Sequence, residues 1–207
     1  MTELDKGILI VLEGIDGGGK TTQARYLLQT LQQNGFDAVY FREPSDSRWG
    51  RLIREKARQP DSLTPQEELE LFQQDRRANV ESNLKPALAD HRVVVLDRYY
   101  FSTMAYQGAK GIDPRRIREI NERFAVPPDL VIILDVEPNR GLERIAERGS
   151  PDLLFEREDY LEKVREIFMS LEGDAFFHVD ARRPPEVVAE DISTIVLDYL
   201  NFFTADG

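Results

Sequence analysis

The chain alternates short apolar runs with longer amphipathic stretches. Residues 8–12 form a continuous run of Ile, Leu and Val, which is typical of a strand buried on both faces of a parallel sheet. Residues 21–33 carry apolar side chains at helical spacing, and Gly35 follows where such a helix would end. Further apolar runs predict strands at residues 38–41, 93–96, 130–134 and 176–179.

The stretches between these strands predict helices. Residues 66–88 predict one long helix, residues 137–147 a shorter one, and residues 187–199 a last amphipathic helix. Strands that alternate with helices imply βαβ units, so we expect a three-layer α/β fold with a five-stranded parallel sheet. The pattern shows no repeat or linker and favours a single domain, residues 1–207, with a short polar lid at about residues 147–157.

Composition and charge exclude several classes of protein. Lys and Arg number 27 against 38 Asp and Glu, and this net charge of −11 has the wrong sign for non-specific binding of nucleic acid. Without Cys there is no disulfide framework, zinc–thiolate cluster or thiol nucleophile. Residues 1–6 are polar, and the apolar run after them is too short for a signal sequence or a membrane span. We therefore expect a cytoplasmic enzyme without nucleic-acid or membrane partners.

A glycine-rich loop follows the first predicted strand. Residues 14–21 have the sequence Gly-Ile-Asp-Gly-Gly-Gly-Lys-Thr, which matches the phosphate-binding loop (P-loop) pattern between a strand and a helix. Glycines let backbone N–H groups converge on phosphate oxygens, and the helix N-terminus adds a positive dipole. The pattern predicts ATP contacts from the loop and the start of the helix, with Lys20 on the β- and γ-phosphates and the Thr21 hydroxyl on Mg²⁺; the predicted set is Gly14, Asp16, Gly17, Gly18, Gly19, Lys20, Thr21 and Thr22.

A second candidate lies at the end of the predicted strand at residues 93–96. Asp97 follows this strand, so it would lie at the carboxyl edge of the sheet, where ligands of open α/β sheets bind. The alternative is an Asp that only caps the next helix. Arg98 comes directly afterwards, and an Arg beside a transferred phosphate supplies charge neutralisation. Because phosphoryl transfer needs mainly positioning and charge, no nucleophilic side chain is required.

Four stretches together resemble the thymidylate kinase family, within the P-loop nucleoside monophosphate kinases. They are residues 13–22, Arg42-Glu43-Pro44, Asp97-Arg98-Tyr99 and residues 102–108, and the likeness extends over about residues 8–180. The resemblance implies a P-loop NTPase-type fold, ATP and Mg²⁺, and the reaction ATP + dTMP → ADP + dTDP. It also implies a homodimer.

The resemblance also implies roles for individual residues. Asp16 would meet the sugar or phosphate of dTMP, and Arg42 and Arg98 would hold its phosphate. Phe72 would stack on thymine, with Arg76 one helical turn later on the base oxygen O4. Without the family context, Phe72 and Arg76 are an ordinary core aromatic and a surface cation.

Further contacts follow from the same likeness. Thr103 would contact the far edge of the base, while Tyr106, with a smaller contribution from Gln107, would leave no room for a ribose 2′-hydroxyl. Arg144 would stack on adenine, and Ala181 would belong to the loop that lines the adenine edge.

Two segments depart from the family pattern. The loop residues Gly17, Gly18 and Gly19 supply no cation besides Lys20, so the lid must provide a catalytic arginine, and Arg148 is preferred over Arg157. In addition, Ser45-Asp46-Ser47 occupies positions where many members have Gly.

Other functions remain as alternatives. A P-loop kinase for a different nucleotide or nucleoside would share most of these residues. A GTP-dependent switch is disfavoured because the chain has no Asn-Lys-x-Asp sequence, and a silent nucleotide-binding module is disfavoured by the presence of Lys20, Thr21, Asp97 and Arg98.

Overall fold

The computed structural model describes residues 2–59, 62–146 and 154–203, without the side chains of residues 154–157. In these residues the strands form one parallel sheet with the order β2-β3-β1-β4-β5. The strands are β1 Ile8–Glu13, β2 Ala38–Arg42, β3 Val93–Asp97, β4 Leu130–Asp135 and β5 Phe176–Asp180. The helices are α1 Lys20–Gln33, α2 Arg48–Lys56, α3 Pro65–Asn79, α4 Lys85–Ala89, α5 Tyr100–Ala109, α6 Pro114–Glu122, α7 Pro138–Ala146, α8 Leu154–Met169 and α9 Pro185–Asn201.

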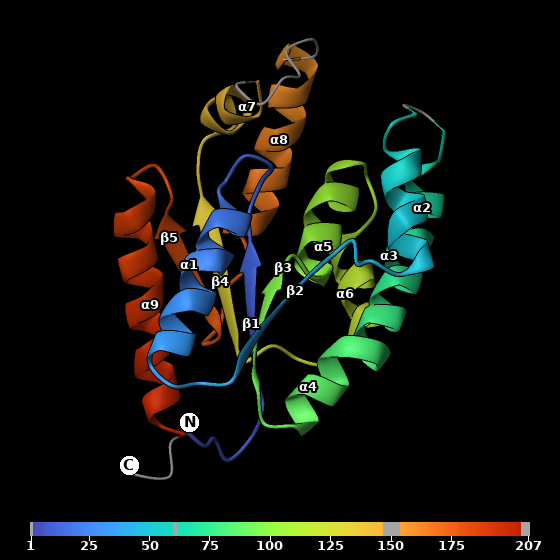
Figure 1. The fold of residues 1–207 in the computed structure, drawn as a ribbon. Helices are drawn as coiled ribbons and strands as arrows, with labels where there is room; N and C mark the ends of the chain where they lie inside the picture. The colour runs from blue at the N-terminus through green and yellow to red at the C-terminus, as the bar shows by residue number, and fades with distance from the viewer. Residues whose placement is uncertain (1, 60–61, 147–153, 204–207) are drawn as a thin grey trace.

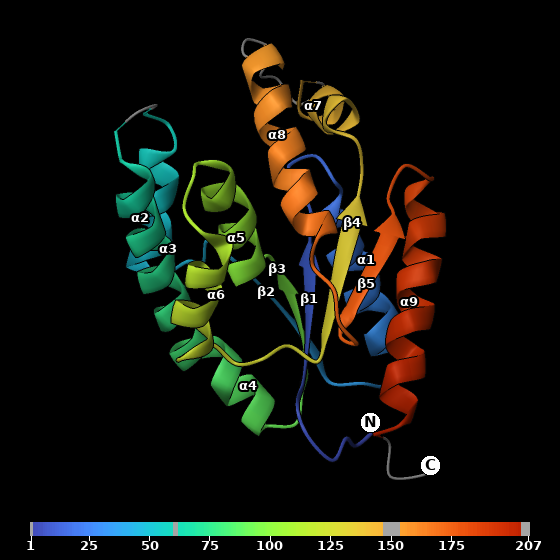
Figure 2. The ribbon, with the colours of Figure 1, turned by 180° about the vertical axis from the view of Figure 1, so that it is seen from behind.

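Helices cover both faces of the sheet and complete the expected three layers. α1 and α9 pack against one face, while α5 and α8 lie on the other with α3 and α6 beside them (Figures 1 and 2). Both described ends of the chain lie at the end of the sheet opposite to α7 (Figure 1). The prediction of a five-stranded parallel sheet between helices is therefore confirmed.

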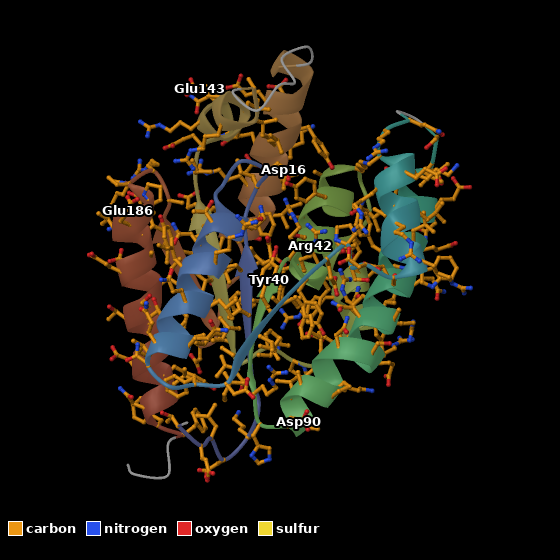
Figure 3. All side chains as sticks on the ribbon, viewed as in Figure 1. Asp16, Tyr40, Arg42, Asp90, Glu143 and Glu186 are labelled. Atoms are coloured by element: carbon orange, nitrogen blue, oxygen red, sulfur yellow. The ribbon has the colours of Figure 1, made fainter. Side chains whose placement is uncertain are left out.

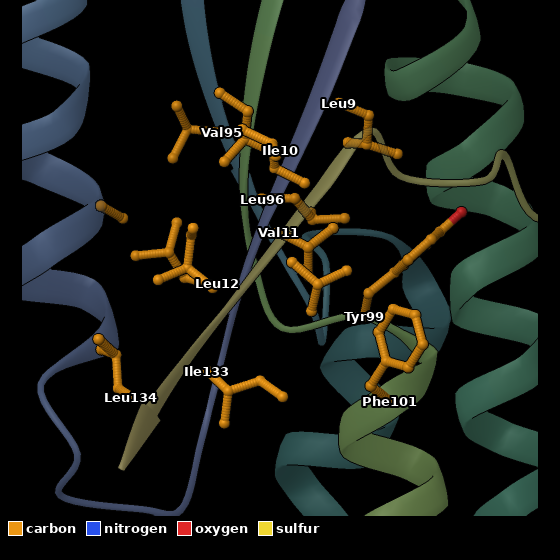
Figure 4. Close-up of a cluster of buried hydrophobic side chains, with 14 of the residues drawn as sticks. Leu9, Ile10, Val11, Leu12, Val95, Leu96, Tyr99, Phe101, Ile133 and Leu134 are labelled. Atoms are coloured by element: carbon orange, nitrogen blue, oxygen red, sulfur yellow. The ribbon is translucent and has the colours of Figure 1, made fainter. Parts of the chain in front are cut away.

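The central strands form because their apolar side chains are buried on both sides. In β1, Ile10 and Leu12 point toward α1, whereas Leu9 and Val11 point toward the side of Tyr99 and Phe101 (Figure 4). All six residues of β1 and all five of β3 are buried. This double burial explains the continuous apolar runs in the sequence, which an amphipathic edge strand would not need.

The prediction of one long helix over residues 66–88 is confirmed as a continuous helical stretch over residues 65–89, but this stretch is not α-helical throughout. α3 ends at Asn79, a π-helical turn covers Val80–Leu84, and α4 then begins at Lys85. Pro86 lies in the first turn of α4 and has no N–H to donate to the preceding helical turn. The π-helical turn before it accommodates the proline without ending the helical stretch.

None of the described helices is long and apolar enough to span a membrane.

α3 begins with a capping box: the Thr64 side chain accepts a hydrogen bond from the Glu67 N–H, and the Glu67 carboxylate accepts one from the Thr64 N–H. α2 begins at a comparable cap, because the Ser47 hydroxyl accepts from the backbone N–H groups of Trp49 and Gly50. These caps fix the two helices that border the site described next.

Candidate active site

The phosphate-binding loop connects the buried strand β1 to α1. Gly19 precedes α1 with a φ of 92°, a left-handed conformation that glycine adopts without strain. The loop therefore turns directly into the helix, with its backbone N–H groups and the helix N-terminus at the carboxyl edge of the sheet. Figure 3 shows Asp16 on this loop.

Lys20 is buried at the start of α1 and folds back over the loop. Its Nζ donates to the carbonyl oxygens of Gly14 and Ile15 at 2.9 and 2.8 Å. Burial, together with the positive charge of Arg98, lowers the pKa of Lys20 to about 8, against the opposing effect of nearby carboxylates. A phosphate group bound beside Lys20 would raise its pKa again, because the negative charge favours the protonated amine.

Three side-chain oxygens meet where β3 ends. The Thr21 hydroxyl donates to Asp97 Oδ2 at 2.6 Å, and the Tyr40 hydroxyl approaches the same oxygen at 3.3 Å. Burial and the Asp97 charge raise the pKa of Tyr40 to about 12, so it remains a protonated donor. The described residues contain no group of three or more His, Cys, Asp and Glu side chains placed to hold a metal. However, nucleotide-bound Mg²⁺ needs only one or two protein oxygens, which Thr21 and Asp97 can supply.

Arg98 has a backbone conformation that side chains seldom adopt, with a φ of 71°. Glu13 is fully buried and stabilises this turn by accepting from the N–H groups of Tyr99 and Ser102 at 2.8 and 3.1 Å. The Arg98 guanidinium donates to Asp16 Oδ1 at 2.5 Å and to Ser102 Oγ at 2.9 Å. A strained residue held in place by its surroundings is a frequent feature of functional sites.

Two cavities meet at this edge of the sheet. The smaller has a volume of about 260 Å³ and the larger about 800 Å³. Most of the predicted ATP residues line the smaller cavity: Asp16, Gly17, Gly19, Lys20, Thr21 and Thr22, together with Arg42 and Asp97. Gly14 and Gly18 are buried and line neither of these two cavities. Both cavities are lined by Asp16, Glu43, Pro44, Arg54 and Arg98, so they are joined at the phosphate-binding loop.

The larger cavity gathers the residues predicted to contact the acceptor base and sugar. It is lined by Phe72, Arg76, Thr103, Tyr106 and Gln107, in addition to the shared Asp16 and Arg98. These residues come from α3 and α5, which lie side by side in both ribbon views (Figures 1 and 2). The sequence prediction thus names residues that the fold brings to one cavity.

Arg76 lies deeper than a surface cation would. It is 1% exposed, and its guanidinium donates to Glu43 Oε2 at 2.8 Å, to Asn121 Oδ1 at 2.7 Å and to Thr103 Oγ1 at 3.0 Å. Burial raises the pKa of Glu43 to about 7, even though the Arg76 charge favours the carboxylate. Arg76 is therefore held rigidly in the wall of the larger cavity.

The segment that departs from the family pattern is fixed by another buried carboxylate. Asp75 accepts from the Ser45 N–H at 2.7 Å and from the hydroxyls of Ser45 and Ser47, each at 2.6 Å. Asp46 is exposed and lies 3.5 Å from Arg42 and 3.2 Å from Arg54. The two serines, at positions where many family members have Gly, thus hold the loop between β2 and α2 through their bonds to Asp75. Arg42, which contacts Asp46, lies at the end of β2 (Figure 3).

Comparison with known proteins decides between the P-loop families. The thymidylate kinase family model matches residues 12–192, a range that includes every residue lining the two cavities. The chain belongs to the thymidylate kinase family.

Individual proteins that are similar to this chain are also thymidylate kinases. A probable thymidylate kinase of Archaeoglobus fulgidus is 46% identical over 196 residues, covering 94% of this chain and 97% of the relative. A thymidylate kinase of Akkermansia muciniphila is 46% identical over 184 residues, covering 89% and 88%. The crystal structure of thymidylate kinase from Ehrlichia chaffeensis superimposes with a TM-score of 0.76 at 25% identity, covering 92% of this chain and 98% of that one.

The residues expected at the adenine side of a thymidylate kinase lie together. Arg144, on α7, donates to the carbonyl oxygens of Gly17 and Ala181, each at 3.2 Å. Arg144 therefore joins the phosphate-binding loop to the segment after β5, while its predicted stacking on adenine stays a prediction. Arg148 lies outside the described residues, as does the side chain of Arg157.

Sequence reasoning missed several residues of this thymidylate kinase site. Glu13 stabilises the Arg98 turn, Glu43 pairs with Arg76, and Arg54 lines both cavities. Tyr160, on α8, lines the larger cavity and donates to the Tyr106 carbonyl at 2.8 Å. Only Glu13 and Glu43 carried a signal, because both lie in the stretches that resemble the thymidylate kinase family.

Proposed function

We propose that the chain transfers the γ-phosphoryl group of ATP to dTMP, giving ADP and dTDP, with ATP phosphates in the smaller cavity and dTMP in the larger one. The observation that carries this assignment is the junction of the two cavities at Asp16 and Arg98. A phosphoryl group can pass between two nucleotides only if their phosphates face each other, and these shared residues mark that meeting point.

On the donor side, the residues of the phosphate-binding corner supply position and charge. The loop N–H groups hold the phosphates, and Lys20 leaves the carbonyls of Gly14 and Ile15 to neutralise the β- and γ-oxygens. Thr21 and Asp97 would hold Mg²⁺, which would neutralise charge on the phosphates when bound. Because Asp97 Oδ2 is already bonded to Thr21, both oxygens are oriented in advance.

On the acceptor side, the proposed phosphate position of dTMP is at the junction of the cavities, where Arg54 and Arg98 line both cavities and Arg42 lines the smaller one. Arg42 and Arg98 were expected there, and Arg54 adds a third guanidinium between the cavities. Phe72 supplies an apolar face for thymine, next to Arg76. Tyr106 would close the space beside the sugar 2′ position, which favours deoxyribose over ribose.

A catalytic lid arginine, Arg148, completes the proposal, because the described loop residues add no cation near the γ-phosphate besides Lys20. Arg148→Ala should lower kcat far more than it raises the KM for dTMP, whereas Arg157→Ala should have a smaller effect. A large kcat loss confined to Arg157→Ala would reverse the assignment.

The homodimer and the cytoplasmic location stay predictions. Light scattering of the purified protein tests whether it is a homodimer.

The proposed reaction is tested by ADP release in the presence of ATP, Mg²⁺ and a panel of acceptors: dTMP, dUMP, dCMP and dGMP. We expect dTMP to be the best acceptor, because the site matches the thymidylate kinase family over most of the chain. A higher kcat/KM for one of the other nucleotides would identify a kinase with a different acceptor. Lys20→Ala serves as the inactive control.

A further inference from the structure

Helix α7 touches the phosphate-binding loop backbone to backbone. A Cβ placed on Gly141 of α7 would lie 2.6 Å from the carbonyl oxygen of Asp16, and a Cβ on Gly17 would lie 2.1 Å from the carbonyl oxygen of Gly141. Both distances are far below van der Waals contact, so neither position has room for a side chain. The ribbon shows α7 beside this loop in opposite views (Figures 1 and 2).

The same part of the loop is held by side chains from two helices. Arg144, one turn after Gly141, donates to the Gly17 carbonyl at 3.2 Å. From the other side, the Tyr106 hydroxyl of α5 accepts a hydrogen bond from the Asp16 N–H at 2.9 Å. Asp16 and Gly17 are thus held between α7 and α5, and both residues line the smaller cavity.

We propose that α7 positions the phosphate-binding loop for the donor phosphates, and that Gly141 is a positioning residue because its missing side chain lets the two backbones meet. This inference rests on the proposed function, since it concerns how the same site binds ATP. The loop acts through N–H groups whose directions are set by its backbone. Any movement of Asp16 and Gly17 therefore changes the phosphate contacts directly.

The substitution Gly141→Ala tests the contact between α7 and the loop without weakening the helix itself. Alanine favours a helix more than glycine does, so the helix itself does not resist the change. The new methyl group must instead displace the Asp16 carbonyl by about 0.8 Å to reach ordinary contact distance. A displacement of this size near reacting groups typically lowers the rate by on the order of 10²-fold.

Gly7→Ala provides a matched control at the other end of β1. A Cβ on Gly7 would lie 2.3 Å from the Leu88 carbonyl oxygen, so this position is crowded by backbone at least as closely as Gly141, and Gly7 lines neither cavity. We expect Gly7→Ala to lower the melting temperature without changing the affinity of the folded protein for nucleotides. Gly141→Ala should weaken donor binding, and it should lower the melting temperature less than Gly7→Ala because alanine favours the helix.

The experiment measures the Kd values for ADP and for dTMP, each alone, by calorimetry, together with melting temperatures and kcat/KM for ATP. We expect Gly141→Ala to weaken ADP binding much more than dTMP binding and to lower kcat/KM for ATP by roughly 10²-fold. Wild-type affinity for ADP in Gly141→Ala, or an equal loss in Gly7→Ala, would overturn the inference. Because ADP binding needs no acceptor, this result is independent of whether dTMP is the substrate.

Discussion

The two cavities are built in different ways. Half of the residues that line the smaller cavity belong to one continuous segment, residues 16–22, at a strand–helix turn whose backbone N–H groups we propose to bind phosphate. The wall of the larger cavity combines side chains of α2, α3, α5 and α8, which lie far apart in the sequence. It also buries charged and polar groups, among them Glu43, Asp75, Arg76 and Asn121.

Because the two cavities are built differently, substitutions in them should affect activity and stability differently. A backbone site keeps its shape when a side chain such as Lys20 is removed, because the strand and the helix hold the loop. A wall of paired buried charges depends on every partner, because an unpaired charge in the interior is costly. Changes in the first region should therefore lower the rate, and changes in the second should lower stability as well.

Arg76→Met should have the largest effect, because it leaves the Glu43 carboxylate buried without its cation. We expect the free energy of unfolding to fall by about 3–5 kcal/mol at pH 8. The loss should be smaller below pH 7, because Glu43 takes up a proton there. Urea unfolding at the two pH values measures both effects.

Two variants control this measurement. Arg116→Met changes an exposed arginine on α6 and should alter stability little. The double variant Glu43→Gln/Arg76→Met removes both charges and should recover part of the loss. If Arg76→Met unfolds at the same urea concentration as Arg116→Met, the buried pair does not stabilise the wall.

Lys20→Ala should lower kcat by on the order of 10²- to 10³-fold, because the developing charge on the phosphates loses its cation. The melting temperature should change much less than in Arg76→Met. Steady-state kinetics at saturating ATP and dTMP, with circular dichroism as the check of folding, measures the contrast. Near-wild-type turnover in a folded variant would exclude Lys20 from the reaction.

Lys20 also predicts how kcat/KM for ATP depends on pH. The lowered pKa of Lys20, about 8, means that the free enzyme loses this positive charge as the pH rises above that value. At saturating dTMP, kcat/KM for ATP should therefore decrease above pH 8, with a slope that approaches about tenfold per pH unit. A rate profile from pH 6.5 to 10 tests this, and a flat profile up to pH 10 would contradict it.

Tyr106→Phe should have the smallest effect, because it keeps the ring over Arg98 and removes only the hydroxyl group, which accepts from the Asp16 N–H. Losing this bond should lower kcat/KM for ATP by roughly fivefold, equivalent to about 1 kcal/mol. Selection of dTMP over its ribonucleotide should persist in Tyr106→Phe and diminish in Tyr106→Ala. Assays with both acceptors measure this, and Tyr26→Phe is the control, because Tyr26 is half-buried and lines neither cavity. Loss of selection already in Tyr106→Phe would assign it to the hydroxyl.

The sequence predicted the sheet well because its central strands, β1, β3 and β4, are apolar on both faces. Each predicted strand begins where the observed one does, but every strand continues for one further residue. These additional residues are all charged: Glu13, Arg42, Asp97, Asp135 and Asp180. A hydrophobic pattern ends at the last apolar residue, whereas the ladder of hydrogen bonds continues to the polar edge where the site lies.

The buried polar network could not be predicted from the sequence. Arg76 was expected on the base, but its contacts with Glu43, Asn121 and Thr103 join four separate segments. No local spacing reports such contacts, because each residue alone resembles an exposed polar side chain. The same holds for Arg54, whose cavity-lining position depends on the packing of α2 against α3.

The position of β1 has a consequence for biosynthesis. This first strand pairs with β3 on one side, Ile8 opposite Val93, and with β4 on the other, Ile10 opposite Leu130. A growing chain leaves the ribosome from its N-terminus, so β1 emerges long before either neighbour. The phosphate-binding loop is thus synthesised well before β3 and β4, and it acquires its final shape only after both strands have paired with β1. We expect nascent chains that end before β4 to be unable to bind ATP, however complete their P-loop sequence.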